Sequence, residues 1–359
     1  MTKKIEIPKT NKAVRLDSIG NFNVVEVPMP ELTGDEILVK VAACGICGSD
    51  IPRIYELGTR VYPVILGHEF SGEVVKVANN EDEHLIGKKV AVFPLIPCRT
   101  CEMCQAGFYA QCRNYNYLGS RSDGAFAEYC KVPSRWHLVF ADNPEVSFED
   151  LSLVEPATVA QHALRKGQLK NGDKVLIIGA GPIGILTARW AQLAGASKVV
   201  LFDILDEKVE FAKDRNLEIY NSSKIDLNIF VQEQTNGLGF DVVVEGTGTS
   251  GGLKSAINTV RTFGNIVLLG NPHRETVIAL NDHSTILRKE IQLVGIWNSY
   301  YNSFPFNEWQ HTVDVISNGK LKVDDLVTHR SNLDNLESLT RKIWKHEVVI
   351  CKAIYSSEA

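Results

Sequence analysis

The stretch Val175–Gly184, with the sequence VLIIGAGPIG, restricts the fold of this 359-residue chain more than any other part of it. An apolar run typical of a buried strand leads into three glycines, and a helix-like run over residues 183–194 follows. The first two glycines let the backbone turn sharply and approach a pyrophosphate, and the third lets the helix pack closely on the strand. The helix N-terminus offers free N–H groups to phosphates. The predicted dinucleotide contacts are Gly179, Gly181, Pro182, Ile183 and Gly184.

A second strand-like run over residues 198–202 ends at Asp203. An acidic residue about 20 positions after such glycines is typical of a carboxylate that binds a ribose 2′-hydroxyl. Its charge would repel a 2′-phosphate, and Ile204 and Leu205 follow instead of an arginine, so the pattern favours NAD over NADP. The alternative is a structural glycine turn and a simple strand-end charge, but the spacing between the two features favours a nucleotide site.

The order of the predicted elements indicates an α/β protein in which one domain is inserted into another. From residue 156 on, strands alternate with helices, which predicts a parallel sheet covered by helices. The expected domains are residues 1–155, residues 156–295 and residues 296–359, with the first and third forming one β-rich domain. The predicted strands are 37–42, 71–77, 88–93, 174–178, 198–202, 240–244, 265–269, 291–296 and 348–355, and the predicted helices are 183–194, 206–215, 251–262 and 305–318.

Composition excludes several classes of partner. The net charge is −5 with no basic cluster, which gives no electrostatic footprint for nucleic acid. No apolar run is long enough to span a membrane, and the N-terminal residues carry charge without the apolar core of a signal peptide. Four of the eight cysteines crowd into one short segment, which suggests metal binding in a reducing compartment. We therefore expect a cytoplasmic protein with neither a nucleic-acid nor a membrane partner.

The cysteine cluster lies in a segment, residues 94–115, that is predicted to form a metal-binding lobe. Four thiolates suit tetrahedral Zn²⁺ in a closed, structural site, because no coordination position remains for a substrate. An iron–sulfur cluster is the alternative, but the last spacing differs from that of ferredoxins and no proline follows the last cysteine. The predicted ligands are Cys98, Cys101, Cys104 and Cys112.

A second set of possible zinc ligands is spread over three segments, at Cys47, His68 and Glu155. Cysteine, histidine and carboxylate form the kind of catalytic zinc site that leaves one position for water or a substrate oxygen. Considered alone, His68 would be an ordinary polar histidine and Glu155 a surface charge. Spacing by itself does not establish that the three segments converge.

The motifs CGICGSD at residues 44–50, GHE at 67–69, the four-cysteine lobe and GAGPIG at 179–184 occur in one order. Together they resemble the zinc-containing medium-chain dehydrogenase/reductase family, in its alcohol and polyol dehydrogenase branch. The resemblance covers nearly the whole chain. It implies a GroES-like β-barrel catalytic domain split around a doubly wound Rossmann domain, with the active site in the cleft between them. It also implies two Zn²⁺ ions per chain, NAD as the cofactor, and a homodimer, for which the strand at 291–296 could pair across a two-fold axis.

The resemblance implies roles for individual residues. Glu155 stands where classical alcohol dehydrogenases have cysteine, which points to the polyol branch. The family's proton relay often continues to a histidine shortly after Asp50, where this chain has Ile51-Pro52-Arg53, so the resemblance does not define the route to solvent. By position, Cys47, His68 and Glu155 are catalytic zinc ligands, Glu69 is an alternative ligand, Ser49 is the relay hydroxyl and Asp50 orients His68.

Within that branch, several stretches most resemble dehydrogenases that act on polyol phosphates, among them residues 47–54, 62–72 and 119–129. The implied reaction is the reversible oxidation of a secondary alcohol to a ketone with NAD, and a neutral polyol of the sorbitol or xylitol type is the alternative substrate. Arg53 and Arg121 are the candidate phosphate contacts, because a guanidinium donates two parallel hydrogen bonds. The alternatives are an ion pair of Arg53 with Glu56 on one helical turn, and a solvated turn arginine at position 121.

Two other classes of protein share parts of this pattern. A non-catalytic interaction protein with a zinc lobe would account for the cysteine cluster but would leave Cys47, Ser49 and His68 without a task. A zinc-free reductase of the quinone type, with the same fold, would not need the ligand set of Cys47, His68 and Glu155.

Overall fold

The computed structural model describes residues 6–359, which form two compact units. One unit comprises the described residues up to Glu155 together with Tyr300–Ala359, and the other is Pro156–Ser299. The sequence places the second boundary at residue 295, and the structure places it at Ser299. The chain leaves the inserted unit later because the backbone N–H of Ile296 still donates to the Leu268 carbonyl, at 3.3 Å.

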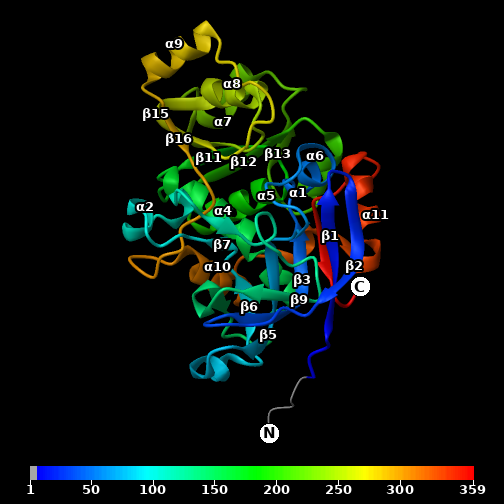
Figure 1. Ribbon diagram of the computed structural model, residues 1–359. Helices are drawn as coiled ribbons and strands as arrows, with labels where there is room; N and C mark the ends of the chain where they lie inside the picture. The colour runs from blue at the N-terminus through cyan, green and yellow to red at the C-terminus, as the bar shows by residue number, and fades with distance from the viewer. Residues whose placement is uncertain (1–5) are drawn as a thin grey trace. The chain divides into compact units, whose positions relative to one another are not determined.

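The inserted unit is built on a six-stranded sheet (Figure 1). Its strands are β11 (Lys174–Ile178), β12 (Lys198–Asp203), β13 (Ile219–Asn221), β14 (Phe240–Glu245), β15 (Val260–Leu268) and β16 (Gln292–Gly295). Their spatial order is β13-β12-β11-β14-β15-β16, and every neighbouring pair is parallel. This confirms the predicted doubly wound fold, in which the chain starts at β11 and extends the sheet in both directions.

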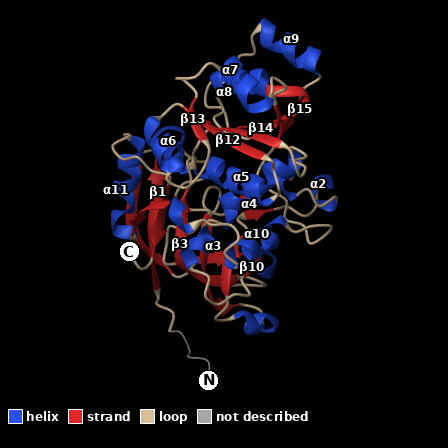
Figure 2. Cartoon of the chain, turned by 180° about the vertical axis from the view of Figure 1, so that it is seen from behind, coloured by secondary structure: helices blue, strands red, loops and turns tan. Residues whose placement is uncertain are grey.

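Helices cover both faces of this sheet, which is why its central strands β11 and β12 are almost entirely apolar and buried. The helices are α5 (Pro182–Leu193), α6 (Asp206–Lys213), α7 (Leu227–Thr235), α8 (Ser250–Thr259) and α9 (Leu280–Lys289). Helix α5 lies on one face, and α7 and α8 lie on the other (Figures 1 and 2). The helix predicted over 251–262 ends at Thr259, because Val260 instead pairs with Phe240 as the first residue of β15.

The other unit is mainly β-structure. Its strands are β1 (Thr10–Ser18), β2 (Asn21–Pro28), β3 (Ile37–Ile46), β4 (Val64–Ile65), β5 (Glu69–Val77), β6 (Lys89–Val92), β7 (Leu95–Ile96), β8 (Asn116–Tyr117), β9 (Tyr129–Val132), β10 (Leu138–Phe140), β17 (Val327–Ser331) and β18 (Lys352–Ser356). The largest sheet has the order β10-β6-β5-β3-β18-β17, with β9 also paired to β3. Strand β18 pairs antiparallel with β3, so the C-terminal segment completes the sheet begun by the N-terminal part.

Short helices flank these strands. They are α1 (Asp50–Pro52), α2 (Glu102–Gln105), α3 (Phe148–Ser152), α10 (Glu308–Ser317) and α11 (Leu333–Trp344), and α4 (Val154–Lys166) begins at the unit boundary. The helix predicted over 305–318 begins at Glu308, because the Asn307 side chain caps it by accepting from the N–H groups of Trp309 and Gln310. Among residues 6–359, no helix is both long and apolar enough to cross a membrane.

Candidate active site and metal centres

The four cysteines of the lobe converge on one point. They lie on the loop between β7 and β8, whose antiparallel pairing closes the base of the lobe. The four Sγ atoms lie within 4.8 Å of one another, and the Cys98–Cys104 and Cys101–Cys112 sulfur pairs are each 3.9 Å apart. A tetrahedral ion with Zn–S bonds of ~2.3 Å separates its sulfurs by about 3.8 Å. The donor set therefore fits a single Zn²⁺ ion.

Hydrogen bonds around Cys98 favour its thiolate. Thr100 Oγ1 donates to Cys98 Sγ at 3.5 Å, and the Cys98 N–H donates to Cys112 Sγ at 3.3 Å. The Thr100 hydroxyl and the nearby backbone N–H groups lower the pKa of Cys98 to about 5. The thiolate is the form of cysteine that binds metals, so this shift favours metal binding by Cys98, whereas burial raises the pKa of Cys104 to about 12.

Cys47, His68 and Glu69 form a second group of possible metal ligands. Their ligand atoms lie within 4.8 Å of one another, and this set of three donors leaves a fourth position for a substrate oxygen. Cys47 follows the end of β3, and the start of β5 lies opposite that end, so pairing of the two strands brings the group together. Gly67 turns the chain into His68 with φ +91°, and a Cβ there would lie 2.9 Å from the Phe126 nitrogen.

Asp50 lies beside both Cys47 and His68. Its buried carboxylate accepts from the Cys47 N–H at 3.0 Å, and Oδ1 lies 3.6 Å from His68 Nδ1. Within residues 6–359, that buried Nδ1 has no hydrogen-bond partner. A small movement of the ring would let Nδ1 donate to Asp50 and present Nε2 to a metal, which is the arrangement expected of a histidine ligand.

The Glu69 carboxylate forms a buried ion pair with Lys352 on β18. Both side chains are 2% exposed, and Lys352 Nζ also donates to the Ile46 carbonyl at 3.1 Å. Burial alone would lower the pKa of Lys352, but the charge of Glu69 and its hydrogen bond raise it above the ordinary value. Sequence analysis missed Lys352, although a lysine inside the otherwise apolar run from Cys351 to Tyr355 is the signal that could have identified it.

Glu155 lies next to the three-residue group but outside it. Glu155 lies in the first turn of α4, and its Oε1 accepts a hydrogen bond from the hydroxyl of Tyr117 at 3.4 Å. Removal from water and the charge of Glu69 together raise the pKa of Glu155 to about 7, against the lowering effect of His68. Tyr117 also presents its ring to that of His68, with centroids 5.7 Å apart at 67°. Tyr117 has no motif around it, and sequence analysis missed it.

Arg53 interacts with the predicted relay hydroxyl. Its Nη1 donates to Ser49 Oγ at 2.7 Å and to Asp50 Oδ1 at 3.3 Å, and Ser49 Oγ in turn donates to Cys47 Sγ at 3.2 Å. The side chain of Arg53 is 30% exposed. Glu56, the alternative partner of Arg53, instead accepts from Trp344 Nε1 at 3.0 Å.

The second candidate phosphate contact, Arg121, is held by Tyr115. Its Nη1 donates to the Tyr115 carbonyl at 2.6 Å, and its guanidinium lies 3.9 Å from the centre of the Tyr115 ring. These contacts hold the Arg121 side chain against Tyr115, so Arg121 has a structural role that Arg53 does not have.

The glycine turn has the geometry of a close strand-to-helix connection. Gly179 follows β11 with φ +103°, and Pro182 opens α5 after Gly181. A Cβ on Gly184 would lie 1.9 Å from the Gly179 carbonyl oxygen, so a larger residue would push the helix away from the turn. Ile183 lies in the first turn of α5, where helix N–H groups have no partner within the helix.

Asp203 is connected directly to this turn. Its Oδ2 accepts from the Ala180 N–H at 2.8 Å, and Oδ1 accepts from the N–H groups of Ile204 and Leu205 at 2.8 and 3.1 Å. Lys208 Nζ lies 3.8 Å from Oδ2. A carboxylate oxygen accepts more than one hydrogen bond, so these contacts leave acceptor capacity for a ribose hydroxyl.

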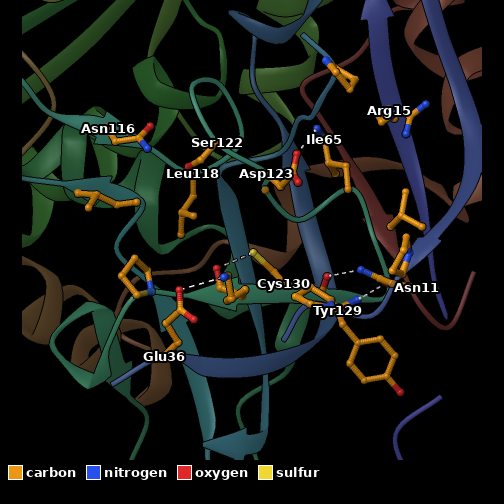
Figure 3. Close-up of a pocket in the computed structure, with 18 residues that line it drawn as sticks. Asn11, Arg15, Glu36, Ile65, Asn116, Leu118, Ser122, Asp123, Tyr129 and Cys130 are labelled. Atoms are coloured by element: carbon orange, nitrogen blue, oxygen red, sulfur yellow. Dashed lines mark hydrogen bonds and ion pairs between the residues drawn. The ribbon is translucent and has the colours of Figure 1, made fainter. Parts of the chain in front are cut away.

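A cavity of about 540 Å³ in the β-rich unit lies apart from these residues (Figure 3). None of the predicted site residues lines it. The Asn11 side chain points toward Tyr129, donating to its carbonyl at 2.8 Å and accepting from its N–H at 3.0 Å, and Asp123 accepts from the Ile65 N–H at 2.9 Å. These contacts tie β1 to β9, and the loop of Asp123 to β4.

Comparison with known proteins places this geometry in a family. Residues 33–142 match the alcohol dehydrogenase GroES-like domain, and residues 182–318 match the zinc-binding dehydrogenase family. Galactitol 1-phosphate 5-dehydrogenase of Escherichia coli K12 is 36% identical over 92% of this chain and 96% of its own. Sorbitol dehydrogenase of Bacillus subtilis 168 is 32% identical over 92% and 93% of the two chains.

A solved structure supports the same assignment. The crystal structure of galactitol-1-phosphate dehydrogenase from Escherichia coli has a TM-score of 0.90 and 33% identity, covering 96% of this chain and 99% of that one. The shared fold, the two groups of ligands and the glycine turn agree with this match. The chain therefore belongs to the zinc-dependent alcohol and polyol dehydrogenases of the medium-chain dehydrogenase/reductase family.

Proposed function

We propose that this enzyme reversibly oxidises a secondary alcohol of a polyol phosphate to the ketose phosphate with NAD, and that galactitol 1-phosphate, oxidised to tagatose 6-phosphate, is its substrate. The observation that carries the proposal is the partly exposed guanidinium of Arg53, 2.7 Å from the Ser49 hydroxyl and next to the candidate zinc ligands. Its contacts with Ser49 and Asp50 use Nη1, and the planar fork has further N–H donors for a phosphate. Similarity to a galactitol 1-phosphate dehydrogenase supports the same choice.

We propose Cys47, His68 and Glu155 as the ligands of the catalytic zinc, with Glu69 as an alternative. Lys352 already balances the charge of Glu69, whereas the contact of Glu155 with Tyr117 is with a neutral hydroxyl. A thiolate and the Glu155 carboxylate then neutralise the two charges of Zn²⁺, and Glu69 and Lys352 neutralise each other.

In this proposal the side chains around the metal move the proton. Bound zinc supplies a Lewis acid that lowers the pKa of the substrate hydroxyl. Ser49 Oγ accepts the substrate hydroxyl proton as its own proton leaves through the nicotinamide ribose to water, and the adjacent positive charge of Arg53 stabilises the negative charge that develops on that oxygen during the transfer. The hydride from the carbinol carbon goes to the nicotinamide of NAD, which the glycine turn and Asp203 bind at its pyrophosphate and ribose.

The test of this function is a panel that pairs each polyol with its phosphate ester, with NADH formation followed by absorbance. We expect galactitol 1-phosphate to give a higher kcat/KM than galactitol, sorbitol or xylitol. The alternative, a neutral polyol dehydrogenase, predicts the opposite order. A chain that transfers no hydride from any secondary alcohol would refute both.

Replacing Arg53 should distinguish the two substrate classes. A hydrogen bond to a charged group is worth ~1.5–3 kcal/mol, so Arg53→Ala should lower kcat/KM for the phosphate ester about 10–150-fold more than for the parent polyol. Steady-state kinetics with both members of one pair measure this difference. Arg121→Ala is the matched control. If Arg53→Ala lowers kcat/KM equally for both substrates, Arg53 acts in the proton relay alone.

Cofactor choice should depend on Asp203. Asp203→Ala removes the proposed acceptor for the ribose hydroxyl, and we expect the KM for NAD to rise about 10-fold, since such a bond is worth ~1.5 kcal/mol. The change removes the carboxylate and leaves Lys208, whose Nζ lies 3.8 Å from Oδ2 of Asp203. We therefore expect the activity with NADP to rise as the activity with NAD falls. Initial rates with each cofactor check this, and a wild-type enzyme that prefers NADP would contradict it.

We also propose a cytoplasmic homodimer. Strand β16 ends the parallel sheet, and its Leu293 is 40% exposed, so a second copy could extend the sheet across a two-fold axis. Light scattering that finds a monomer at working concentrations would refute the dimer.

A further inference from the structure

We propose that Tyr117 is a positioning residue for the catalytic metal: its hydroxyl holds Glu155 so that one carboxylate oxygen faces the ion. This inference rests on the proposed role of Glu155 as a zinc ligand. Tyr117 is not part of any motif that identifies the family here, and its relation to the site appears only in the folded chain.

The first observation is the contact itself. The Tyr117 hydroxyl donates to Glu155 Oε1 at 3.4 Å, which is long for a hydrogen bond between oxygens. Because the bond uses Oε1, it leaves Oε2 for the metal and fixes the rotation of the carboxylate.

The second observation is that the same side chain contacts another candidate ligand. The Tyr117 ring meets the ring of His68 edge to face, with centroids 5.7 Å apart. A substitution that keeps the ring therefore preserves the packing against His68 and removes only the hydrogen bond to Glu155.

The third observation concerns what holds Tyr117 in place. Tyr117 lies on β8, opposite Leu95 on β7, and these two strands form the base of the structural zinc lobe. The N–H of Leu118 also donates to the Pro94 carbonyl at 2.9 Å. The backbone of Tyr117 is thus fixed by a hairpin, as a residue that positions a ligand requires.

The experiment compares Tyr117→Phe with Tyr115→Phe. Tyr115 is the neighbouring tyrosine, and its ring lies 6.3 Å from that of Tyr117, but it does not contact Glu155 through any described hydrogen bond. Partners of metal ligands typically contribute 10–100-fold to metal affinity. We expect Tyr117→Phe to weaken zinc at the catalytic site by that factor in a chelator competition, with zinc in the lobe unchanged, and Tyr115→Phe to leave both sites unchanged.

A double-mutant cycle with Glu155→Gln separates positioning from general packing. Glu155→Gln alone should weaken catalytic zinc, and adding Tyr117→Phe should then cost little more. Substitution of Co²⁺ at the catalytic site gives a second readout, because its absorption spectrum should change in Tyr117→Phe and not in Tyr115→Phe.

Each outcome decides the proposal. Catalytic-site affinity in Tyr117→Phe equal to that in Tyr115→Phe would overturn it, as would additive losses in the cycle. If Glu155→Gln binds zinc normally, the ligand assignment fails and the role of Tyr117 fails with it. These measurements do not depend on turnover, so an error in the proposed substrate would leave their result standing.

Discussion

Cys47→Ser should greatly lower turnover and remove one of two zinc ions while the chain stays folded. Zinc contributes several kcal/mol by stabilising charge in the transition state, and a loss of ~4 kcal/mol corresponds to about 1,000-fold in kcat. The fold should survive, because Cys47 lies in a three-donor group at the end of β3 and each unit keeps its own apolar core. Zinc content per chain, kcat and the melting temperature measure the three effects separately.

Cys130→Ser is the control for this change. Cys130 is a buried cysteine that lies outside both groups of ligands, so its replacement should retain two zinc ions and turnover. If Cys47→Ser binds two zinc ions and turns over normally, the ligand assignment is wrong. If it unfolds like a lobe variant, the two sites do not have the separate roles that their geometry suggests.

Cys101→Ser should have the opposite pattern, with its main effect on stability. Structural zinc in isolated zinc-finger peptides contributes ~10–16 kcal/mol to folding, and a lobe within a larger unit should keep only part of that. A loss of even ~3 kcal/mol lowers the melting temperature by roughly 6–12 °C in a unit of 150–250 residues. We therefore expect the lobe zinc to be lost and the β-rich unit to melt at a clearly lower temperature.

Zinc analysis and thermal unfolding of Cys101→Ser and Cys47→Ser, made side by side, test this contrast. The two variants carry the same chemical change, a thiol replaced by a hydroxyl, in a closed four-sulfur site and in an open mixed site. Equal melting temperatures for both would contradict a structural role for the lobe. Normal zinc content in Cys101→Ser would show that the four sulfurs do not bind one ion together.

The amino-acid sequence by itself determined the features that depend on neighbouring residues. The apolar run before Gly179 required a buried strand, and β11 covers the predicted residues 174–178. The four cysteines of the lobe are close in sequence, so a single loop can bring them to one ion. The alternation of strands and helices after residue 156 led to the parallel sheet, because each βαβ unit is a local pattern with a preferred handedness.

Only the tertiary structure decided how distant segments meet. Cys47 and His68 converge because β3 pairs with β5, and Lys352 reaches Glu69 across 283 positions of sequence because β18 also pairs with β3. A buried lysine next to a metal site is stable only when a carboxylate compensates its charge, and no local pattern shows which carboxylate that is. Arg53 has an acidic residue within one helical turn on each side, Asp50 and Glu56, and it bonds Asp50 because Glu56 is taken by Trp344 from a distant segment.

The same limit applies to the two glutamates and to Tyr117. As candidate ligands, Glu69 and Glu155 are equivalent by residue type. They differ in what the fold places beside them, which is a lysine from the C-terminal strand for Glu69 and a tyrosine from the hairpin at the base of the cysteine lobe for Glu155. The physical reason is that charge balance and desolvation depend on distances in space. Sequence spacing gives such distances within one turn, strand or loop, and strand pairing sets them between segments that lie far apart in the chain.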